Sequence, residues 1–147
     1  MAQIRTADAT WQGDLTSGSG TIDYVGSGAF SRMPVSWHAR TEASDGQTSP
    51  EELLAAAHAS CFSMALSVRL AKAGHPAAKL SVRATVTFDK GDAGWKVASS
   101  ALRVQGDVPG MSATDFRALA EDARDNCPIS QALKGNVALS VEASLVG

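Results

Sequence analysis

The chain contains two cysteines, Cys61 and Cys127, which are the first candidates for chemistry because a thiolate is a good nucleophile. Cys61 lies in the apolar stretch "LLAAAHASCFSMALS", where a thiol often serves only as a small core residue. Cys127 precedes Pro128 at the expected start of a short helix, where free backbone N–H groups stabilise a thiolate. From the residues alone, Cys61 is a core residue, a nucleophile, a metal ligand or half of a disulfide. Cys127 is an activated thiol or an incidental one at a helix break.

A metal centre is the least favoured of these alternatives. His58 and Cys61 are three residues apart and share a helix face, but a closed zinc site takes four ligands, usually in paired short spacings. Nothing near Cys127 supplies the second pair, so we expect His58 to be a core or interface histidine. A Gly-x-Ser-x-Gly nucleophile motif is absent as well. We therefore expect neither a metal nor a cofactor.

A thiol that attacks a peroxide needs a cation beside it. At the ordinary thiol pKa of ~8.5, only about 3% of a cysteine is ionised at pH 7. An arginine stabilises the thiolate and donates hydrogen bonds to the alkoxide that develops on the leaving oxygen. Arg40, at the end of an expected weak strand Met33–Thr41, is the preferred candidate. Arg32 is held in reserve, and Arg5 is a weaker candidate.

Glu51 is the acidic residue best placed to orient such an arginine. It precedes Cys61 by ten residues, which is about 15 Å along one helix, so Glu51 cannot touch the thiol of its own chain directly. If the two share a site, Glu51 reaches it from another subunit or through intervening groups. The simpler interpretation is that Glu51 and Glu52 stabilise the helix N-terminus by about 0.3–1 kcal/mol each.

The long helix that carries Cys61 is the clearest element in the sequence. Ser49 is a good N-cap, Pro50 fits the first helical position, and Glu52 completes a Ser-x-x-Glu capping box. Gly74 ends the helix, which we expect over about Pro50–Ala73. Because its first two-thirds are apolar on nearly every face, we expect it to be buried on several sides, through the middle of the molecule.

The remaining elements surround this helix in the sequence. Turns at 16–21 and 26–30 separate short N-terminal strands, and alternation in "LSVRATVTF" predicts a half-buried strand. The expected elements after it are a hairpin partner, two helices and a terminal strand: Trp95–Val108, Ser112–Asn126, Pro128–Lys134 and Val137–Leu145. This order predicts an α+β fold, with residues 1–147 as one domain.

Composition excludes several classes of function. The 13 basic and 15 acidic residues give a net charge of −2 with no basic patch, so we expect no nucleic-acid partner. The uncharged run Leu53–Val68 is shorter than the ~20 residues that span a bilayer. The N-terminal residues lack the apolar stretch of a secretory signal, which favours a cytoplasmic protein.

Two long motifs carry a resemblance to a known family. "TSPEELLAAAHASCFSMALS", followed later by "NCPISQALKGNV", resembles the osmotically inducible protein C / organic hydroperoxide resistance (OsmC/Ohr) family. The form of the first motif, with His58 before the cysteine, is closer to the OsmC branch. "ATWQGDL" near the start and "DAGWKV" in the expected hairpin extend the resemblance over most of the chain.

The resemblance implies an intertwined homodimer with two long central helices, antiparallel sheets wrapped around them and active sites at the dimer interface. It implies a thiol peroxidase that reduces organic hydroperoxides and, to a varying extent, hydrogen peroxide. Cys61 matches the cysteine that attacks the peroxide and becomes a sulfenic acid. Cys127 matches the resolving cysteine that forms a disulfide with it.

The family also supplies expected roles for Glu51 and Arg40, and an expected reductant. Glu51 matches the glutamate that orients the catalytic arginine, and Arg40 matches the OsmC-branch position of that arginine, although the loop between them departs from the common pattern. The expected reductant is a dithiol, a lipoylated protein. The helix-terminus argument alone favours Cys127 as the more acidic thiol, so the roles of the two cysteines rest on the resemblance.

A second hypothesis from a different class is a non-enzymatic dimeric module that holds an apolar ligand at its interface. Its pocket would be lined by large apolar side chains: Met33, Trp37, Phe62, Met64, Met111 and Phe116. A third is a purely structural disulfide. Loss of two thiols on adding one equivalent of hydroperoxide separates the enzyme from the binding module, and a structural disulfide predicts lower stability on reduction with no consumption of peroxide.

Overall fold

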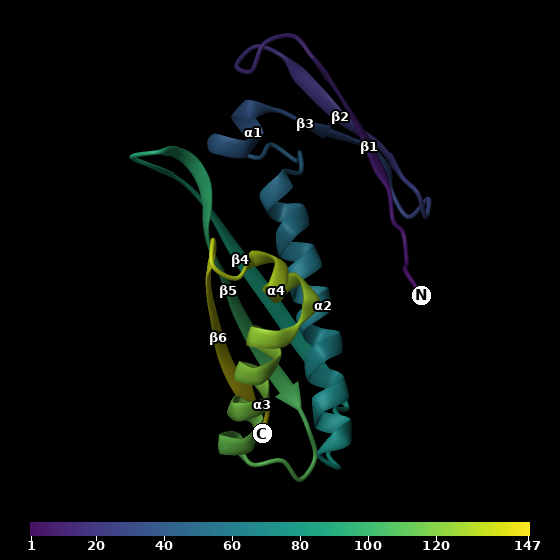
Figure 1. The fold of residues 1–147 in the computed structure, drawn as a ribbon, viewed down its shortest axis with the longest axis vertical. Coiled ribbons are helices and arrows are strands. Elements are labelled where there is room, and N and C mark those ends of the chain that lie inside the picture. The colour runs from purple at the N-terminus through teal and green to yellow at the C-terminus, as the bar shows by residue number, and fades with distance from the viewer. The chain divides into compact units, whose positions relative to one another are not determined.

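The computed structural model describes all 147 residues, Met1–Gly147, which divide into two units, Met1–Leu53 and Leu54–Gly147 (Figure 1). The elements run in the order β1 (Ala7–Gln12), β2 (Ser19–Val25), β3 (Ser31–Val35), α1 (Trp37–Thr41), α2 (Pro50–Lys72), β4 (Lys79–Gly91), β5 (Gly94–Asp107), α3 (Ala113–Asn126), α4 (Pro128–Leu133) and β6 (Ala138–Leu145). The expected α+β class and the long helix are confirmed. That the chain is a single domain stays a prediction.

The first unit is built on an antiparallel sheet in the order β1-β2-β3. The expected strand Met33–Thr41 is wrong in its second half, because β3 ends at Val35 and residues 37–41 form α1. The hydroxyl of Ser36 accepts the backbone N–H of Ala39 at 3.1 Å and so caps this helix. The alternation of Val35 and Trp37 therefore straddles the end of a strand and the start of a helix. Arg40 lies on that helix.

Helix α2 begins and ends where its capping residues predict. The Ser49 hydroxyl accepts the backbone N–H of Glu52 at 3.1 Å, which is one half of the expected capping box. The other half differs, because the Glu52 carboxylate accepts the hydroxyl of Thr48 at 2.9 Å. At the C-terminus Gly74 takes φ +84°, and the backbone N–H groups of Gly74 and His75 donate to carbonyls of the last turn as in a Schellman motif.

The second unit contains a three-stranded sheet in the order β4-β5-β6. β4 and β5 form an antiparallel hairpin, as expected, but β6 runs parallel to β5. The expectation of a wholly antiparallel sheet is therefore wrong for this strand. Helices α3 and α4 lie between β5 and β6 in the chain and supply the crossover that a parallel pair requires.

The core of the second unit lies between the sheet and helices α2 and α3 (Figure 1). Phe62, Leu66 and Leu70 recur at every fourth residue of α2 and are fully buried. Gly106 on β5 allows close packing here, because a Cβ at this position would lie 2.6 Å from Cζ of Phe116.

The burial of α2 is one-sided, which differs from the all-round burial expected from its composition. Met64 is 72% exposed and Val68 is 46% exposed on the side away from the core. By length and composition alone α2 is apolar enough to cross a membrane. Its packed face, with Phe62 and Leu66 in the core, favours the alternative that it is a core helix.

Candidate active site

The two thiols meet in the second unit. Cys61 lies on α2 and is half-buried, and it packs against the core cluster to which the fully buried Cys127 belongs. Both are free thiols. Burial raises the pKa of Cys61 above its ordinary value, the backbone N–H of Ile129 opposes this, and the neighbouring Cys127 raises it further. Its surroundings therefore favour the thiol form of Cys61 over the thiolate.

The chain geometry between α3 and α4 fixes Cys127. Cys127 ends α3 and is the N-cap of α4, with φ −65° and ψ 144°, which is the extended conformation expected before Pro128. Its sulfur accepts the backbone N–H of Ser130 at 3.3 Å and lies 3.0 Å from the Ser130 hydroxyl. The sulfur of Cys127 thus has two polar contacts with one residue.

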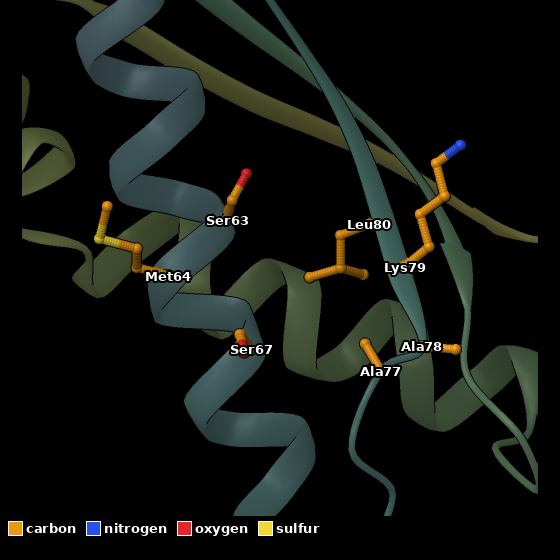
Figure 2. A pocket seen from close by; sticks show the side chains of 7 residues that line it. All are labelled: Ser63, Met64, Ser67, Ala77, Ala78, Lys79 and Leu80. Atoms are coloured by element: carbon orange, nitrogen blue, oxygen red, sulfur yellow. The ribbon is translucent and has the colours of Figure 1, made fainter.

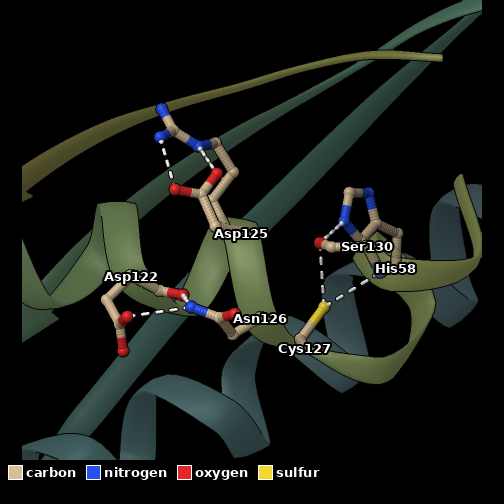
Figure 3. A network of polar contacts seen from close by, with 7 residues as sticks. His58, Asp122, Asp125, Asn126, Cys127 and Ser130 are labelled. Carbon is tan, nitrogen blue, oxygen red and sulfur yellow. Dashed lines mark hydrogen bonds and ion pairs between the residues drawn. The ribbon is translucent and has the colours of Figure 1, made fainter. Parts of the chain in front are cut away.

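A buried polar network continues from Cys127 into the core (Figure 3). Nε2 of His58 lies 2.8 Å from the hydroxyl of Ser130, and Nδ1 lies 2.6 Å from the hydroxyl of Ser100 on β5. His58 and the two serines are fully buried. Burial lowers the pKa of His58, which keeps the ring neutral. The expectation of a core histidine is confirmed.

The two serines were not among the predicted site residues. The spacing Cys127-x-x-Ser130 at a helix start is the spacing of an N-cap and its N3 residue, so it carried a usable signal. Ser100 carried none, because it is 42 residues from His58 and lies on a strand whose register only the fold determines.

Arg40 and Glu51 form an ion pair within the first unit. Nε of Arg40 donates to both carboxylate oxygens of Glu51 at 3.1 Å, and Nη2 donates to Oε1 at 2.7 Å. The Glu51 side chain is 9% exposed and that of Arg40 is 31% exposed. A two-pronged pair of this kind fixes the plane of the guanidinium. Arg32, the reserve candidate, lies exposed on β3, so the structure pairs Glu51 with the preferred arginine.

An apolar pocket of about 310 Å³ adjoins Arg40 in the same unit. Its lining contains one charged group and is otherwise apolar or small: Trp11, Leu15, Val35, Ser36, Trp37, Arg40 and Pro50. A pocket with a single cation among aromatic and aliphatic side chains suits a ligand with an apolar body and one polar group.

A second pocket of about 310 Å³ lies between α2 and the start of β4 (Figure 2). It is lined by Ser63, Met64, Ser67, Ala77, Ala78, Lys79 and Leu80. Of the apolar side chains expected to line a ligand pocket, Met64 lines this pocket and Trp37 lines the pocket beside Arg40, whereas Phe62 and Phe116 are buried in the core. No group of three His, Cys, Asp or Glu side chains is gathered in the structure.

The fold and its two neighbouring free thiols define the class, an α+β protein with one cysteine on a long helix and the other at the junction of the two helices packed beside it. The family model described as OsmC-like protein matches residues 43–142, and the chain belongs to this family. The family expected from the two motifs is confirmed.

Relatives and solved structures agree with this assignment. The chain is 39% identical over 142 residues to "Peroxiredoxin OsmC" of Escherichia coli (strain K12), covering 97% of this chain and 98% of that protein. It is 36% identical over 97 residues to "Organic hydroperoxide resistance protein OhrA" of Bacillus subtilis (strain 168), covering 65% and 66%. The crystal structure of OhrB of Bacillus subtilis matches with a TM-score of 0.72 at 25% identity, over 94% of this chain and 97% of that one. The OsmC-like protein of Mycoplasma pneumoniae, at 18% identity, shares the fold with a TM-score of 0.74 over the whole of both chains.

Proposed function

We propose that the chain is a cysteine-based thiol peroxidase that reduces organic hydroperoxides to alcohols and, to a varying extent, hydrogen peroxide to water. The observation that carries the proposal is the contact of two free thiols, Cys61 and Cys127, in a chain with full-length similarity to a peroxiredoxin. The apolar pocket beside Arg40 favours an organic substituent on the peroxide.

In the first step the Cys61 thiolate attacks the terminal oxygen of the hydroperoxide. The O–O bond breaks, Cys61 becomes a sulfenic acid, and the alkoxide takes up a proton to leave as the alcohol. We assign Arg40 to stabilise the thiolate and the developing alkoxide, and Glu51 to hold the guanidinium in place. The raised pKa of Cys61 supports a need for this cation.

In the second step Cys127 attacks the Cys61 sulfur, the S–O bond breaks, and water leaves as the disulfide forms. A dithiol then restores both thiols by two successive exchanges. The resemblance points to a lipoylated protein as this reductant, because a lipoyl group carries two thiols on a flexible arm. The cytoplasmic location, which suits such a partner, stays a prediction.

We propose that the protein acts as a homodimer with active sites at the interface. The side of α2 away from the core carries Ala56, Ser60, Met64 and Val68 at intervals of four residues, and Met64 and Val68 are well exposed. Small and apolar residues at this spacing suit packing against a second helix. Glu51 and Cys61 are about 15 Å apart along one helix, and this separation supports the proposal that a second chain completes the site.

The proposal is tested by titrating reduced protein with cumene hydroperoxide and mapping the product by mass spectrometry. We expect loss of two thiols per hydroperoxide and a Cys61–Cys127 disulfide. Cys61→Ser should abolish turnover, and Cys127→Ser should allow one turnover and then stop. Substantial turnover by the Cys61→Ser variant, or no thiol loss in the unaltered protein, contradicts the proposal.

The arginine is tested by comparing Arg40→Met with Arg32→Met. Only the former should slow the first thiol loss. Mixing Arg40→Met and Cys61→Ser subunits then tests the interface, because a mixed dimer regains one intact site only if the arginine serves the other chain. Equal effects of the two arginine variants would remove Arg40 from the mechanism, and no recovery on mixing would place the site within one chain.

A further inference from the structure

The buried row Cys127–Ser130–His58–Ser100 has no part in the two chemical steps as assigned. It joins four elements of the second unit, since the groups come from the α3–α4 junction, α4, α2 and β5. A role in packing alone does not need it, because an apolar side chain would fill the position of His58 without polar partners to satisfy. The row ends at a sulfur that is fully buried, from which a proton has no direct route to solvent.

We propose that Ser130 and His58 form a proton relay that serves Cys127 in the resolving step. This inference rests on the proposed peroxidase function. The proton of Cys127 passes to the Ser130 hydroxyl, whose own proton passes to Nε2 of His58. Ser130 acts on the reacting sulfur directly, whereas His58 acts through it as a positioning and proton-holding residue.

The distances support both end states of such a transfer. With Cys127 as a thiol, S–H donates to the Ser130 oxygen, Ser130 O–H donates to Nε2 of His58, and Nδ1–H donates to Ser100. After transfer, Nε2–H donates to the Ser130 oxygen. The thiolate then accepts both the hydroxyl and the backbone N–H of Ser130. Every heavy atom keeps its partner, so only protons move.

The step balances without a further reactant. Neutral His58 takes the proton of Cys127, and the thiolate attacks the sulfenic sulfur of Cys61. The S–S bond forms, the S–O bond breaks, and hydroxide leaves. This hydroxide and the proton held on His58 together make one water, so His58 returns to its neutral form. The disulfide is the oxidised product, and the electrons it gave up are those already accepted by the peroxide.

The surroundings of His58 leave it free to take this proton. Burial is the cause that lowers its pKa, and no charged neighbour contributes. The titratable groups nearest in the chain and network are Cys61, one turn along α2, and Cys127. On the packed elements, α4 carries no charge, and Arg124 and Asp125 at the end of α3 pair with each other at 2.9 Å. Because burial lowers the pKa of His58, the ring is neutral at pH 7 and its Nε2 can accept a proton.

The experiment follows the two thiol losses separately in the reduced full-length chain after one equivalent of cumene hydroperoxide. Dimedone trapping of the sulfenic acid reports the first step, and quenched counting of free thiols reports the second. The variants are His58→Gln, which keeps polar contacts but cannot hold the proton, and Ser130→Ala, which removes one oxygen and is the milder change for folding. Ser100→Ala is the matched control, because it removes a buried partner of the same ring outside the path to Cys127.

We expect His58→Gln and Ser130→Ala to leave the first step unchanged and to slow the second by about tenfold or more at pH 7, where an unassisted thiol is only ~3% ionised. In the unaltered protein the second step should vary little between about pH 6.5 and 8, whereas in His58→Gln it should rise about tenfold per pH unit. Ser100→Ala should keep the flat profile.

Each other result has a definite meaning. A flat profile and an unaltered second step in folded His58→Gln or Ser130→Ala overturn the relay while the peroxidase function stands. An effect confined to the first step would mean that His58 and Ser130 act on the reaction of Cys61, and it overturns the relay. Absence of any thiol loss in the unaltered protein is the failure of the proposed function itself.

Discussion

Replacing Glu51 with glutamine tests whether the buried carboxylate orients Arg40 or only stabilises a helix end. Glu51 accepts three N–H bonds from Arg40, at 2.7, 3.1 and 3.1 Å, through both oxygens. Glutamine keeps one of these acceptors and presents an N–H₂ group where the other stood. The guanidinium then loses its two-pronged contact and becomes free to rotate out of its plane.

The size of the effect follows from the burial of the pair. Breaking a fully buried pair destabilises a protein by about 3–5 kcal/mol, and exposed pairs contribute about 0–1 kcal/mol. Glu51 is almost buried, but Arg40 is about one-third exposed and can be solvated when its partner is lost. We therefore expect a loss of about 1–3 kcal/mol in unfolding free energy. A misplaced guanidinium should also lower kcat/KM for cumene hydroperoxide by about 10–100-fold.

The matched control is Glu52→Gln, since Glu52 is the other acid of the first turn of α2. Both substitutions remove the same charge from the same helix end, an effect of about 0.3–1 kcal/mol. Glu52 contacts the hydroxyl of Thr48 and has no contact with Arg40 among its hydrogen bonds. Urea unfolding and the rate of the first thiol loss are measured for both. Equal losses of rate in the two variants would refute the orienting role, and a loss of stability without a loss of rate would leave Glu51 a structural residue only.

Three further outcomes follow from the packing. Gly106→Ala should destabilise the protein by about 1–3 kcal/mol in urea unfolding, because the new methyl would lie 2.6 Å from the Phe116 ring, and Phe116→Leu in the same chain should recover part of that loss. Ser49→Ala should remove about 0.5–2 kcal/mol by deleting the N-cap of α2, and an unchanged urea midpoint would contradict the cap. Burial lowers the pKa of His58, so on acidification the unfolded chain takes up a proton before the folded protein does. The contribution of His58 to the free energy of unfolding should therefore be full above pH ~6.5 and should be lost as the pH falls towards the folded pKa. The loss on acidification should be smaller in His58→Gln.

Local signals in the sequence predicted the helices well. Ser49 and Gly74 bound α2 through side-chain and backbone capping geometry, and Ser112 caps α3 in the same way. The strand β6 was placed in the chain by its alternation, but its parallel direction depends on where α3 and α4 return the chain, which no local pattern encodes. The error at Met33–Thr41 has the same origin, because two alternating apolar residues are too few to separate a strand from a helical turn.

In the candidate site, too, local patterns predicted some residues and only the fold determined the others. Resemblance of motifs singled out the two cysteines, Glu51 and Arg40, and the structure adds that the arginine and the carboxylate are in contact. The polar network that ends at Cys127 was not predicted, because His58 and Ser100 meet only through the packing of β5 on α2. Sequence patterns identify residues that repeat or cap, whereas contacts across 42 residues need the fold.

The placement of Cys61 suggests how its reactivity is controlled. His58 and Phe62 bracket it on the buried face of α2, so the thiol stands at the margin of the core, where burial and Cys127 both raise its pKa. The second unit alone therefore holds Cys61 as a thiol, which is a poor nucleophile. The cation that we propose stabilises the thiolate, Arg40, belongs to the first unit, where the carboxylate of Glu51 holds it by three hydrogen bonds. Under the proposed mechanism the two requirements of the chemistry, an inert resting thiol and a rigid cation, are met by different parts of the chain, and assembly of the dimer is what makes the thiol reactive.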